Sequence, residues 1–397
     1  MAGAIDGRAA SIGSDDAGVA TRHTLALMPG WRARALLVFF GMLLALGTTE
    51  AALRFREREF RRGMEAANGW DPDQACNCAD SELVYRPIPG RCGANSRGFV
   101  DVEHRVPKPE GVFRIVVVGD SIAIGHPHAY WNSFANVLER LANELCTRRA
   151  VEVVVLAVPG YSSSQEEVIL EREAMRYEPD LIVWSYCLND PAHPLYHDSN
   201  GQLGRYFHRP ALYVADLVER GLFSAREWWR ARTRRCPAEF HEFLHCAYRD
   251  EVRATFAQLA RFGAASGVPI VVAIHPLIER DGSPETYPLA DLHEVLRRLA
   301  SNDGLTVVDL VPAYRGATWQ EIGVGYDERG WFDCYHPNAW GHELAGRYLL
   351  SQLVKRSLVP CEAGAVGVGS SGQGVDERMH VRRSSPRAVD HSRTRSR

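Results

Sequence analysis

RIVVVGDS, residues 114–121, is the stretch that decides the fold. Four consecutive β-branched residues, Ile115 to Val118, are typical of a buried strand, and Gly119 allows a sharp turn where that strand ends. Such a turn leaves the next side chains exposed at the start of the following segment. The sequence therefore predicts a strand that presents Asp120 and Ser121 at the edge of a sheet.

Four further apolar runs follow this strand, and helical patterns separate them. The predicted strands are 114–119, 151–157, 180–186, 269–275 and 305–310, and the predicted helices are 133–149, 163–177, 250–266, 288–300 and 338–353. Continuous apolar strands that alternate with helices are typical of a parallel sheet covered on both faces. We therefore predict an α/β fold over residues 113–360, a three-layer α/β/α sandwich with a mainly parallel five-stranded sheet.

Helix caps can be predicted for three of these helices. Ser163-x-x-Glu166 resembles a capping box, Asp250 is a candidate cap for the helix that follows it, and Asn338 for the last helix.

Four segments flank the predicted domain. Residues 1–30 are small and polar, and residues 361–397 are rich in Gly, Ser and Arg, so both are predicted to be disordered. Residues 31–54 contain the uncharged run ALLVFFGMLLALGTT at Ala35–Thr49. Residues 55–112 are rich in Pro, Gly, Asn and Cys and are predicted to form a juxtamembrane lead-in.

The apolar run within residues 31–54 has three interpretations. At 1.5 Å per residue, about 19 apolar residues nearly cross a hydrocarbon layer of ~30 Å, which favours an uncleaved signal anchor. A cleaved signal peptide and a buried core helix are the alternatives, although a core helix should show a polar face. We predict a single-pass protein of the cytoplasmic membrane that contacts the bilayer through this helix.

The orientation of the predicted span is indicated by features that disagree. More arginines follow the span than precede it, which alone favours a cytoplasmic C-terminal side. The nine cysteines show no metal-ligand spacing, and Cys76 and Cys78 are too close for such a pair. The cysteines could form disulfides in an oxidising compartment and would stay thiols in the cytosol, so their number favours the outside, as does the family resemblance given below. At least one cysteine must stay free or pair outside the chain. We predict an extracytoplasmic, periplasmic α/β domain.

Composition excludes one class of partner. The 397 residues contain 46 Lys and Arg against 49 Asp and Glu, a net charge of −3. Because phosphate binding needs a basic excess, nucleic acid is not expected as a partner. No cofactor or metal motif stands out either.

Residues 191–249 form an insertion between the third strand and the next helix. The segment contains Trp228, Trp229, several tyrosines and several histidines. A connection of this length normally has structure or function of its own. It leaves the sheet beside Asn189, so we predict a lid or a cap that shapes a binding site, with a plain surface excursion as the alternative.

Three side chains have the chemistry of a nucleophilic triad. A serine hydroxyl is a poor nucleophile until a base takes its proton, and His336 is the candidate base for Ser121. Asp333 lies three residues before His336, close enough in a turn to bond its Nδ1 and leave Nε2 for the serine. Taken alone, each motif also fits an ordinary turn or helix cap.

Attack by a serine on an ester creates an oxyanion that needs hydrogen-bond donors already in place. Three donors are predicted, the backbone amides of Ser121 and Gly160 and the side-chain amide of Asn189. Each residue follows a predicted strand, and the carboxyl ends of parallel strands share one edge of a sheet, where ligands bind. The five residues are therefore expected to meet at one site.

The order Ser121, Gly160, Asn189 and Asp333-x-x-His336 resembles the SGNH hydrolases, also called GDSL-type esterases and lipases. The resemblance covers about residues 114–353, and the lead-in resembles that of membrane-anchored bacterial members. It implies a flavodoxin-like fold and a triad of Ser121, Asp333 and His336. It also implies Ser121, Gly160 and Asn189 as oxyanion donors. The motif reads GDSI instead of GDSL, and Cys187 stands where the family usually has glycine.

The resemblance predicts an ester hydrolase that forms an acyl-enzyme, with carbohydrate or lipid esters of the cell envelope as candidate substrates. An O-acyltransferase could use the same triad, and a catalytically silent binding or assembly protein could keep the fold. A metal-dependent phosphoesterase with Asp120, Asp190 and Asp333 as ligands is disfavoured, because too few further ligands lie nearby.

Overall fold

The computed structural model describes residues 30–68, 76–127, 130–146, 148–197, 201–327 and 330–361. The segments predicted to be disordered, 1–30 and 361–397, lie outside these residues except for Gly30 and Cys361. The described chain forms two compact units. One contains residues 30–60 and 210–218, and the other contains residues 61–209 and 219–361.

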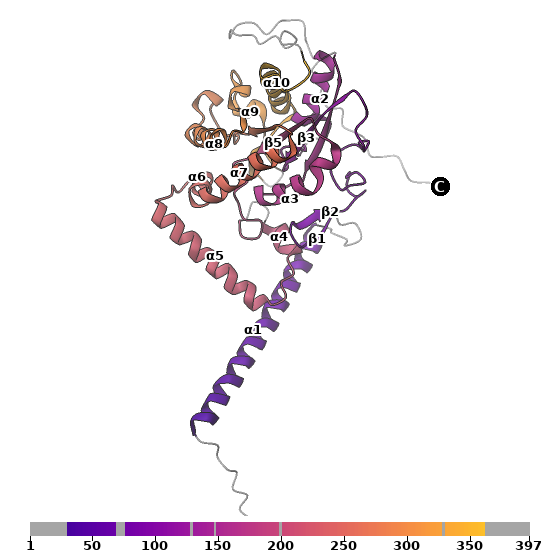
Figure 1. The fold of residues 1–397 in the computed structure, drawn as a ribbon. Helices are drawn as coiled ribbons and strands as arrows, with labels where there is room; N and C mark the ends of the chain where they lie inside the picture. Colours follow the sequence, from indigo (N-terminus) through magenta and orange to yellow (C-terminus); the bar gives the residue numbers. More distant parts are fainter. Residues whose placement is uncertain are drawn as a thin grey trace, which may run out of the picture. The chain divides into compact units, whose positions relative to one another are not determined.

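The larger unit is built on a five-stranded parallel sheet (Figure 1). Its strands are β3 (Val112–Gly119), β4 (Ala150–Ala157), β5 (Leu181–Tyr186), β6 (Ile270–Ile274) and β7 (Thr306–Asp309), in the order β4-β3-β5-β6-β7. Most residues of β3, β4, β5 and β6 are buried, because helices cover both faces of the sheet, whereas the edge strand β7 is mostly half-buried. The predicted α/β sandwich with five parallel strands is confirmed.

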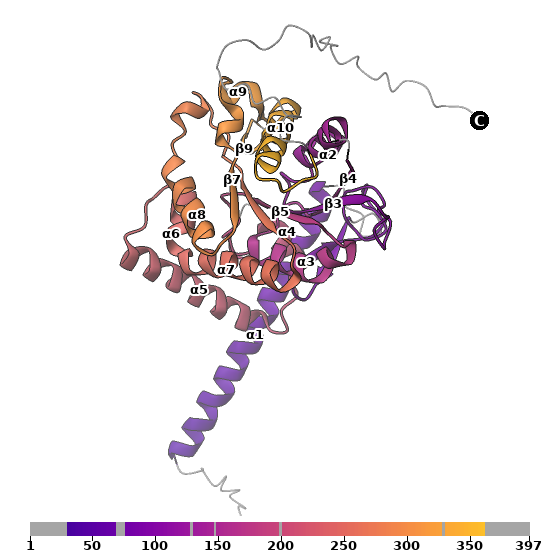
Figure 2. The same ribbon diagram turned by 45° about the horizontal axis from the view of Figure 1, so that its top comes forward.

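Helices from distant parts of the sequence cover the two faces of the sheet (Figure 2). On one face α2 (Phe134–Leu145) packs against α10 (Ala339–Lys355). On the other, α3 (Ser163–Glu173) contacts α7 (Arg249–Ser266), which in turn contacts α8 (Ala290–Asn302). This arrangement leaves the carboxyl ends of the strands free of covering helices, so the loops there can build a site.

Two predicted helix starts are wrong by one or two residues. The capping box before α3 is formed by Ser162 and Gln165, so Glu166 turns inward and is fully buried. Asp250 lies in the first turn of α7, whose cap is Tyr248. The Asn338 cap is confirmed, because its side chain accepts a hydrogen bond from Gly341 N at 3.0 Å.

The structure contains two antiparallel hairpins that the hydrophobic pattern of the sequence did not predict. Within the predicted lead-in, β1 (Asn77–Asp80) pairs with β2 (Val84–Pro87). Near the C-terminus, after α9 (Trp319–Ile322), β8 (Gly323–Tyr326) pairs with β9 (Phe332–Pro337). The strands are four to six residues long, too short for an alternating pattern to stand out. The second hairpin carries both Asp333 and His336.

Disulfides tie together segments of the larger unit. Cys76 pairs with Cys92 beside the first hairpin, and Cys146, the C-cap of α2, pairs with Cys361 beyond α10. Cys236 pairs with Cys246 within the insertion. The remaining three cysteines, Cys78, Cys187 and Cys334, are unpaired. An odd cysteine was predicted to remain, but the pairing could not be read from the sequence.

The smaller unit contains most of α1 (Gly30–Asn68), whose apolar part is long enough to cross a membrane by length and composition. None of this apolar window is buried against protein. Glu50 and Arg54 of α1 bond residues 210–218 in the same unit, at Val214 N and Ala211 O.

The insertion at 191–249 is mostly helical. It contains α4 (Gly201–Phe207), α5 (Tyr213–Arg234) and α6 (Phe240–Ala247). Its role as a lid stays a prediction.

Candidate active site

Ser121, His336 and Asp333 form one chain of hydrogen bonds. His336 Nε2 lies 2.8 Å from Ser121 Oγ, and His336 Nδ1 lies 2.7 Å from Asp333 Oδ2. The two histidine nitrogens therefore bond the two partners that the sequence predicted, across 215 residues of sequence. With Nδ1 donating to the carboxylate, Nε2 is left as the acceptor for the serine proton.

The turn after β3 lies so close to the neighbouring strand β5 that only glycine fits at its start. This tight turn leaves the hydroxyl of Ser121 facing the edge of the sheet. A Cβ atom at Gly119 would lie 2.7 Å from Ser185 Cβ on the neighbouring strand, so a side chain does not fit. Asp120 turns inward, and its Oδ1 accepts the N–H of Ile122 at 2.9 Å. Ser121 consequently faces the opposite way, at the edge of the sheet.

Asp333 orients His336 through both of its oxygens. Oδ1 accepts the backbone N–H groups of Tyr335 at 2.9 Å and His336 at 3.0 Å, while Oδ2 accepts the ring N–H. Burial opposes ionisation of this carboxyl, but the hydrogen bond and charge of His336 keep the pKa of Asp333 below its ordinary value. The carboxylate is thus ionised at neutral pH, as an orienting group must be.

Gly160 and Asn189 line the same small cavity as Ser121 and His336. This cavity has a volume of about 120 Å³, and Pro159, His126 and Tyr335 complete its lining. Gly160 has φ +79°, a left-handed conformation that strains residues with a side chain. The structure thus brings all five predicted residues together.

Asn189→Ala is expected to lower kcat by about 10²–10³-fold with little change in KM, because one oxyanion donor is lost. Steady-state kinetics on p-nitrophenyl acetate would measure this. Asn302→Ala, at the distant end of α8, is the matched control. A loss of less than about threefold in kcat would remove Asn189 from the oxyanion site.

Sequence reasoning missed the residues that hold the Gly160 loop. Tyr85 of the lead-in hairpin is buried, and its hydroxyl donates to Pro159 O at 2.9 Å. In return Tyr161 donates its hydroxyl proton to Tyr85 O at 2.7 Å. No local pattern marks Tyr85, because its role depends on contacts with a loop 74 residues away.

His126 and His128 follow Ser121 closely in the sequence, which makes both candidates for the cavity wall, with an ordinary structural role as the alternative. The ring centroid of His126 lies 4.9 Å from that of His336, and His126 lines the cavity. His128 lies outside the described residues. His275 is fully buried, with Nε2 3.1 Å from Ser185 Oγ, and burial lowers its pKa to about 3. His275 is therefore a neutral core residue.

Three buried carboxyl groups lie behind the cavity, on Asp120, Glu166 and Asp190. Burial raises the pKa of Asp120 to about 6, and it raises the pKa values of Glu166 and Asp190 well above the ordinary range, with mutual repulsion adding to the effect. Both oxygens of Glu166 lack a hydrogen-bond partner within the described part of the chain. Glu166 and Asp190 therefore favour the protonated, neutral form, whereas Asp120 is mostly ionised at neutral pH.

Glu166→Gln is expected to stabilise the protein at alkaline pH. A carboxyl whose folded pKa is raised contributes stability that is fully present below its unfolded pKa of about 4.3 and is lost as the pH rises through the folded pKa. The amide cannot ionise, so the free energy of unfolding should rise by about 1–3 kcal/mol at pH 8 and change little at pH 4.5.

Denaturant unfolding at the two pH values would measure the effect of Glu166→Gln. Glu171→Gln is the control, since Glu171 lies on the same helix but is exposed and bonded to Gln258. A Glu166→Gln variant that is less stable than wild type at pH 8 would show that the folded protein uses the Glu166 carboxylate.

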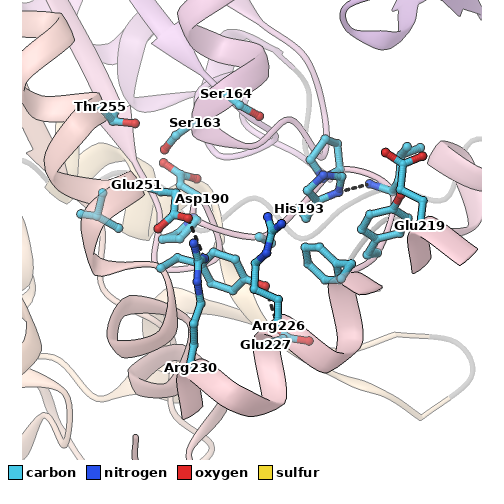
Figure 3. Close-up of a pocket in the computed structure, with 18 of the residues that line it drawn as sticks. Ser163, Ser164, Asp190, His193, Glu219, Arg226, Glu227, Arg230, Glu251 and Thr255 are labelled. Carbon is cyan, nitrogen blue, oxygen red and sulfur yellow. Dashed lines mark hydrogen bonds and ion pairs between the residues drawn. The ribbon is translucent and has the colours of Figure 1, made fainter. Parts of the chain in front are cut away.

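A second, larger cavity of about 720 Å³ lies between the insertion, α3 and α7 (Figure 3). Its wall includes Asp190, directly after Asn189, and Ser163, three residues after Gly160. Asp190 Oδ1 and Ser163 Oγ are buried and have no hydrogen-bond partner in the described ranges. Arg226 of α5 also lines this cavity.

The larger cavity also contains charged groups that are already paired. Arg230 forms an ion pair of 2.6 Å with Glu251, and the Tyr248 hydroxyl donates to Glu227 at 2.9 Å. The wall of the cavity is therefore largely an ordered set of polar and charged groups.

The residues considered as metal ligands do not form a metal site in the described chain. No group of three or more His, Cys, Asp or Glu side chains has suitable geometry there. Cys187, which replaces the expected glycine, is buried, and burial raises the pKa of its thiol well above the ordinary value.

Comparison with known proteins gives one family and several similar structures. A family model for the GDSL-like lipase/acylhydrolase family matches residues 117–344. No curated protein sequence matches significantly.

Solved structures of three enzymes illustrate the similarity. The lipase/acylhydrolase of Enterococcus faecalis is 18% identical, covering 63% of this chain and 100% of that one, with a TM-score of 0.37. Axe2, an acetylxylan esterase from Geobacillus stearothermophilus, is 16% identical over 61% and 94%, with a TM-score of 0.39. LAE5, an alpha/beta hydrolase enzyme from the metagenome of Lake Arreo, Spain, is 15% identical over 60% and 94%, with a TM-score of 0.39.

The family match begins two residues before Gly119 and ends beyond His336, so it includes every residue of the hydrogen-bonded chain described above and more than half of the sequence. The chain therefore belongs to the GDSL-like lipase/acylhydrolase family and is an ester-bond hydrolase.

Proposed function

We propose that this enzyme hydrolyses carboxylic esters through an acyl-enzyme formed on Ser121. The observation that carries the proposal is the distance of 2.8 Å between Ser121 Oγ and His336 Nε2, with Asp333 bonded to the other ring nitrogen. A hydroxyl in this arrangement can lose its proton to the ring at the moment of attack.

In the first half of the reaction, Ser121 Oγ bonds the acyl carbon while His336 Nε2 takes the serine proton. The carbonyl oxygen becomes negative, and the N–H groups of Ser121 and Gly160 and the Asn189 amide stabilise it. As the carbon–oxygen bond of the ester breaks, His336 gives the proton to the departing alcohol. Water then repeats these steps on the acyl-serine, releasing the acid and restoring the Ser121 hydroxyl.

Two alternatives share this fold. An O-acyltransferase would replace water by a second hydroxyl in the last step, with the same triad. A silent binding protein has no use for a histidine already aligned between Ser121 and Asp333, so the bond pattern favours catalysis over that alternative.

We infer that the alcohol part of the substrate is rich in hydroxyl groups and binds in the larger cavity (Figure 3). Polar and charged side chains such as Ser164, Glu219 and Arg226 line the cavity, and a polyol offers them donors and acceptors in several directions. A long acyl chain offers none. This supports an ester of a carbohydrate over an ester of a simple lipid alcohol.

We further propose that α1 anchors the enzyme in the cytoplasmic membrane as a single span, with the hydrolase domain on the extracytoplasmic side. Three disulfides within the described residues support this orientation, because disulfides persist mainly in oxidising compartments. The arginines after the span remain the opposing observation.

A fluorophosphonate probe tests the proposed chemistry. The full-length protein in detergent should be labelled at Ser121 and should hydrolyse p-nitrophenyl acetate, and EDTA should change neither result. If EDTA abolishes turnover, the metal-dependent alternative gains. A protein that neither reacts with the probe nor turns over any ester would favour the binding-protein alternative.

A comparison of two substrates tests whether the alcohol part of the ester binds in the larger cavity. Ser164→Ala, at an exposed serine in the cavity wall, should lower kcat/KM for an O-acetylated oligosaccharide by about two- to tenfold, the value of one lost hydrogen bond, and leave that for p-nitrophenyl acetate unchanged. Ser351→Ala on α10 is the control for a lost serine hydroxyl. Equal losses on both substrates would contradict the assignment of the cavity.

A further inference from the structure

Helix α5 (Tyr213–Arg234) carries an exposed apolar stripe along one side. The stripe consists of Leu217, Val218, Leu222, Trp228 and Trp229, all of them exposed. At 100° per residue these five side chains fall within an arc of about 140°. The exposed fraction is 64% for Leu222, 60% for Trp228 and 63% for Trp229.

The opposite side of α5 faces protein and carries both charged residues and Phe223, which packs against the buried cluster that contains Leu244 and Tyr248. Within the larger unit, Glu227 and Arg230 line the larger cavity, where both are bonded to neighbouring residues. An ordinary surface helix keeps its large apolar residues on the inward side, whereas α5 exposes most of them. An outward apolar stripe of this length indicates a surface that another phase or molecule covers.

The first turn of α5 belongs to the smaller unit, together with most of α1. There Val214 N–H donates to Glu50 Oε2 at 2.8 Å, and Arg54 Nη2 donates to Ala211 O at 2.8 Å. Glu50 follows the apolar run, and along a helix it lies about 28 Å from Trp31, close to the thickness of a hydrocarbon layer. If Trp31 marks one face of a bilayer, the start of α5 lies at the level of the other.

We propose that α5 is an interfacial helix whose stripe inserts into the headgroup region of the bilayer that α1 spans. This inference rests on the proposed membrane anchor. Tryptophan is enriched at this depth in membrane proteins, and paired tryptophans beside leucine and arginine are typical of helices that lie in the interface plane.

Arg232 fits the same environment. It is exposed on the stripe side of α5, and its guanidinium lies 5.5 Å from the centre of the Trp228 ring. An arginine in this position can extend its charge to lipid phosphates while its aliphatic part stays among apolar groups. A lipid surface is the covering partner that fits the stripe, because the first turn of α5 is bonded to α1, the helix proposed to span the membrane.

Tryptophan quenching in proteoliposomes tests the proposal. The full-length protein is reconstituted once in ordinary lipid and once in lipid brominated on its acyl chains, which quenches tryptophans that insert. Subtracting the spectrum of Trp228→Phe/Trp229→Phe from that of wild type isolates the emission of the two tryptophans. Brominated lipid should remove most of this emission, and acrylamide added to the water should remove little.

Trp131→Phe is the matched control, because Trp131 is exposed in the larger unit away from α5. Its emission should respond to acrylamide and not to brominated lipid. Emission from Trp228 and Trp229 that behaves like that of Trp131 would overturn the proposal. Shielding from both quenchers would overturn it in favour of a second copy of the chain as the covering surface.

Two further readouts separate this inference from the proposals on which it depends. Extraction with alkaline carbonate reports on α1 alone, because a spanning helix resists it. Hydrolysis of p-nitrophenyl acetate by the double variant should equal that of wild type. A protein that resists carbonate and hydrolyses the ester but shows no quenching contradicts only the interfacial role of α5.

Discussion

Ser121→Ala is expected to lower kcat for p-nitrophenyl acetate by about 10⁴–10⁶-fold. The variant keeps the oxyanion donors but loses the oxygen that bonds the acyl carbon, so only slow attack by water remains. KM should change little, because the side chain contributes to the transition state and not to ground-state binding. End-point assays of ester hydrolysis over several hours would measure the residual rate. Wild-type protein inactivated by the fluorophosphonate probe would give the background rate.

The stability of the Ser121→Ala variant separates a chemical effect from a folding effect. Ser121 Oγ bonds only His336 in the described chain, so thermal unfolding should shift by no more than a few degrees. Ser351→Ala should keep full activity. A Ser121→Ala variant that retains more than about one-tenth of wild-type kcat would show that the nucleophile lies elsewhere.

The sheet and the site residues could be predicted because each depends on local sequence. Uninterrupted apolar runs such as Ile115–Val118 indicate buried strands, and residues directly after parallel strands must gather at one edge of the sheet. Asp120 and Asn189 illustrate the limit of this reasoning. Their positions follow from the strands, but only the structure shows that Asp120 turns inward and Asn189 toward the cavity.

The features that escaped prediction depend on contacts between distant residues. Tyr85 supports the Gly160 loop from a short hairpin in a segment interpreted as a lead-in. The buried position of Glu166 follows from a capping box that starts one residue earlier than predicted, at Ser162. A shift of one residue rotates a helix by 100°, enough to move a glutamate from solvent into the core.

The insertion shows the same limit for function. Its length predicted a structured element beside Asn189, but not which faces of its helices would be apolar. The stripe on α5 is readable from the sequence as Val218, Leu222 and Trp229, which are four and seven residues apart, a helical spacing. Without coordinates, such a stripe is assigned to the core, and only the exposed fractions reveal that it faces outward.

Asp333→Asn is expected to lower kcat by about 10⁴-fold while leaving the fold of the second hairpin intact. Asparagine keeps an oxygen that can accept the backbone N–H groups of Tyr335 and His336. Its NH₂ group then faces His336 Nδ1 in place of the carboxylate oxygen. To accept that hydrogen bond, Nδ1 must lose its proton, so the ring carries its proton on Nε2, facing Ser121.

A ring protonated on Nε2 cannot take the serine proton, and this tautomer explains the size of the expected loss. Labelling of Ser121 by the fluorophosphonate probe should slow in parallel with turnover, because both need the same proton transfer. Asp327→Asn, in the loop of the same hairpin, is the control and should keep wild-type kcat, since Asp327 bonds the backbone of Trp331 away from the triad. If Asp333→Asn stays within about tenfold of wild type, the aspartate does not set the tautomer, and the carboxyl that orients His336 must be sought among its other neighbours. Asp120 is the first to examine, because its charge interacts with His336 from the buried side of the site.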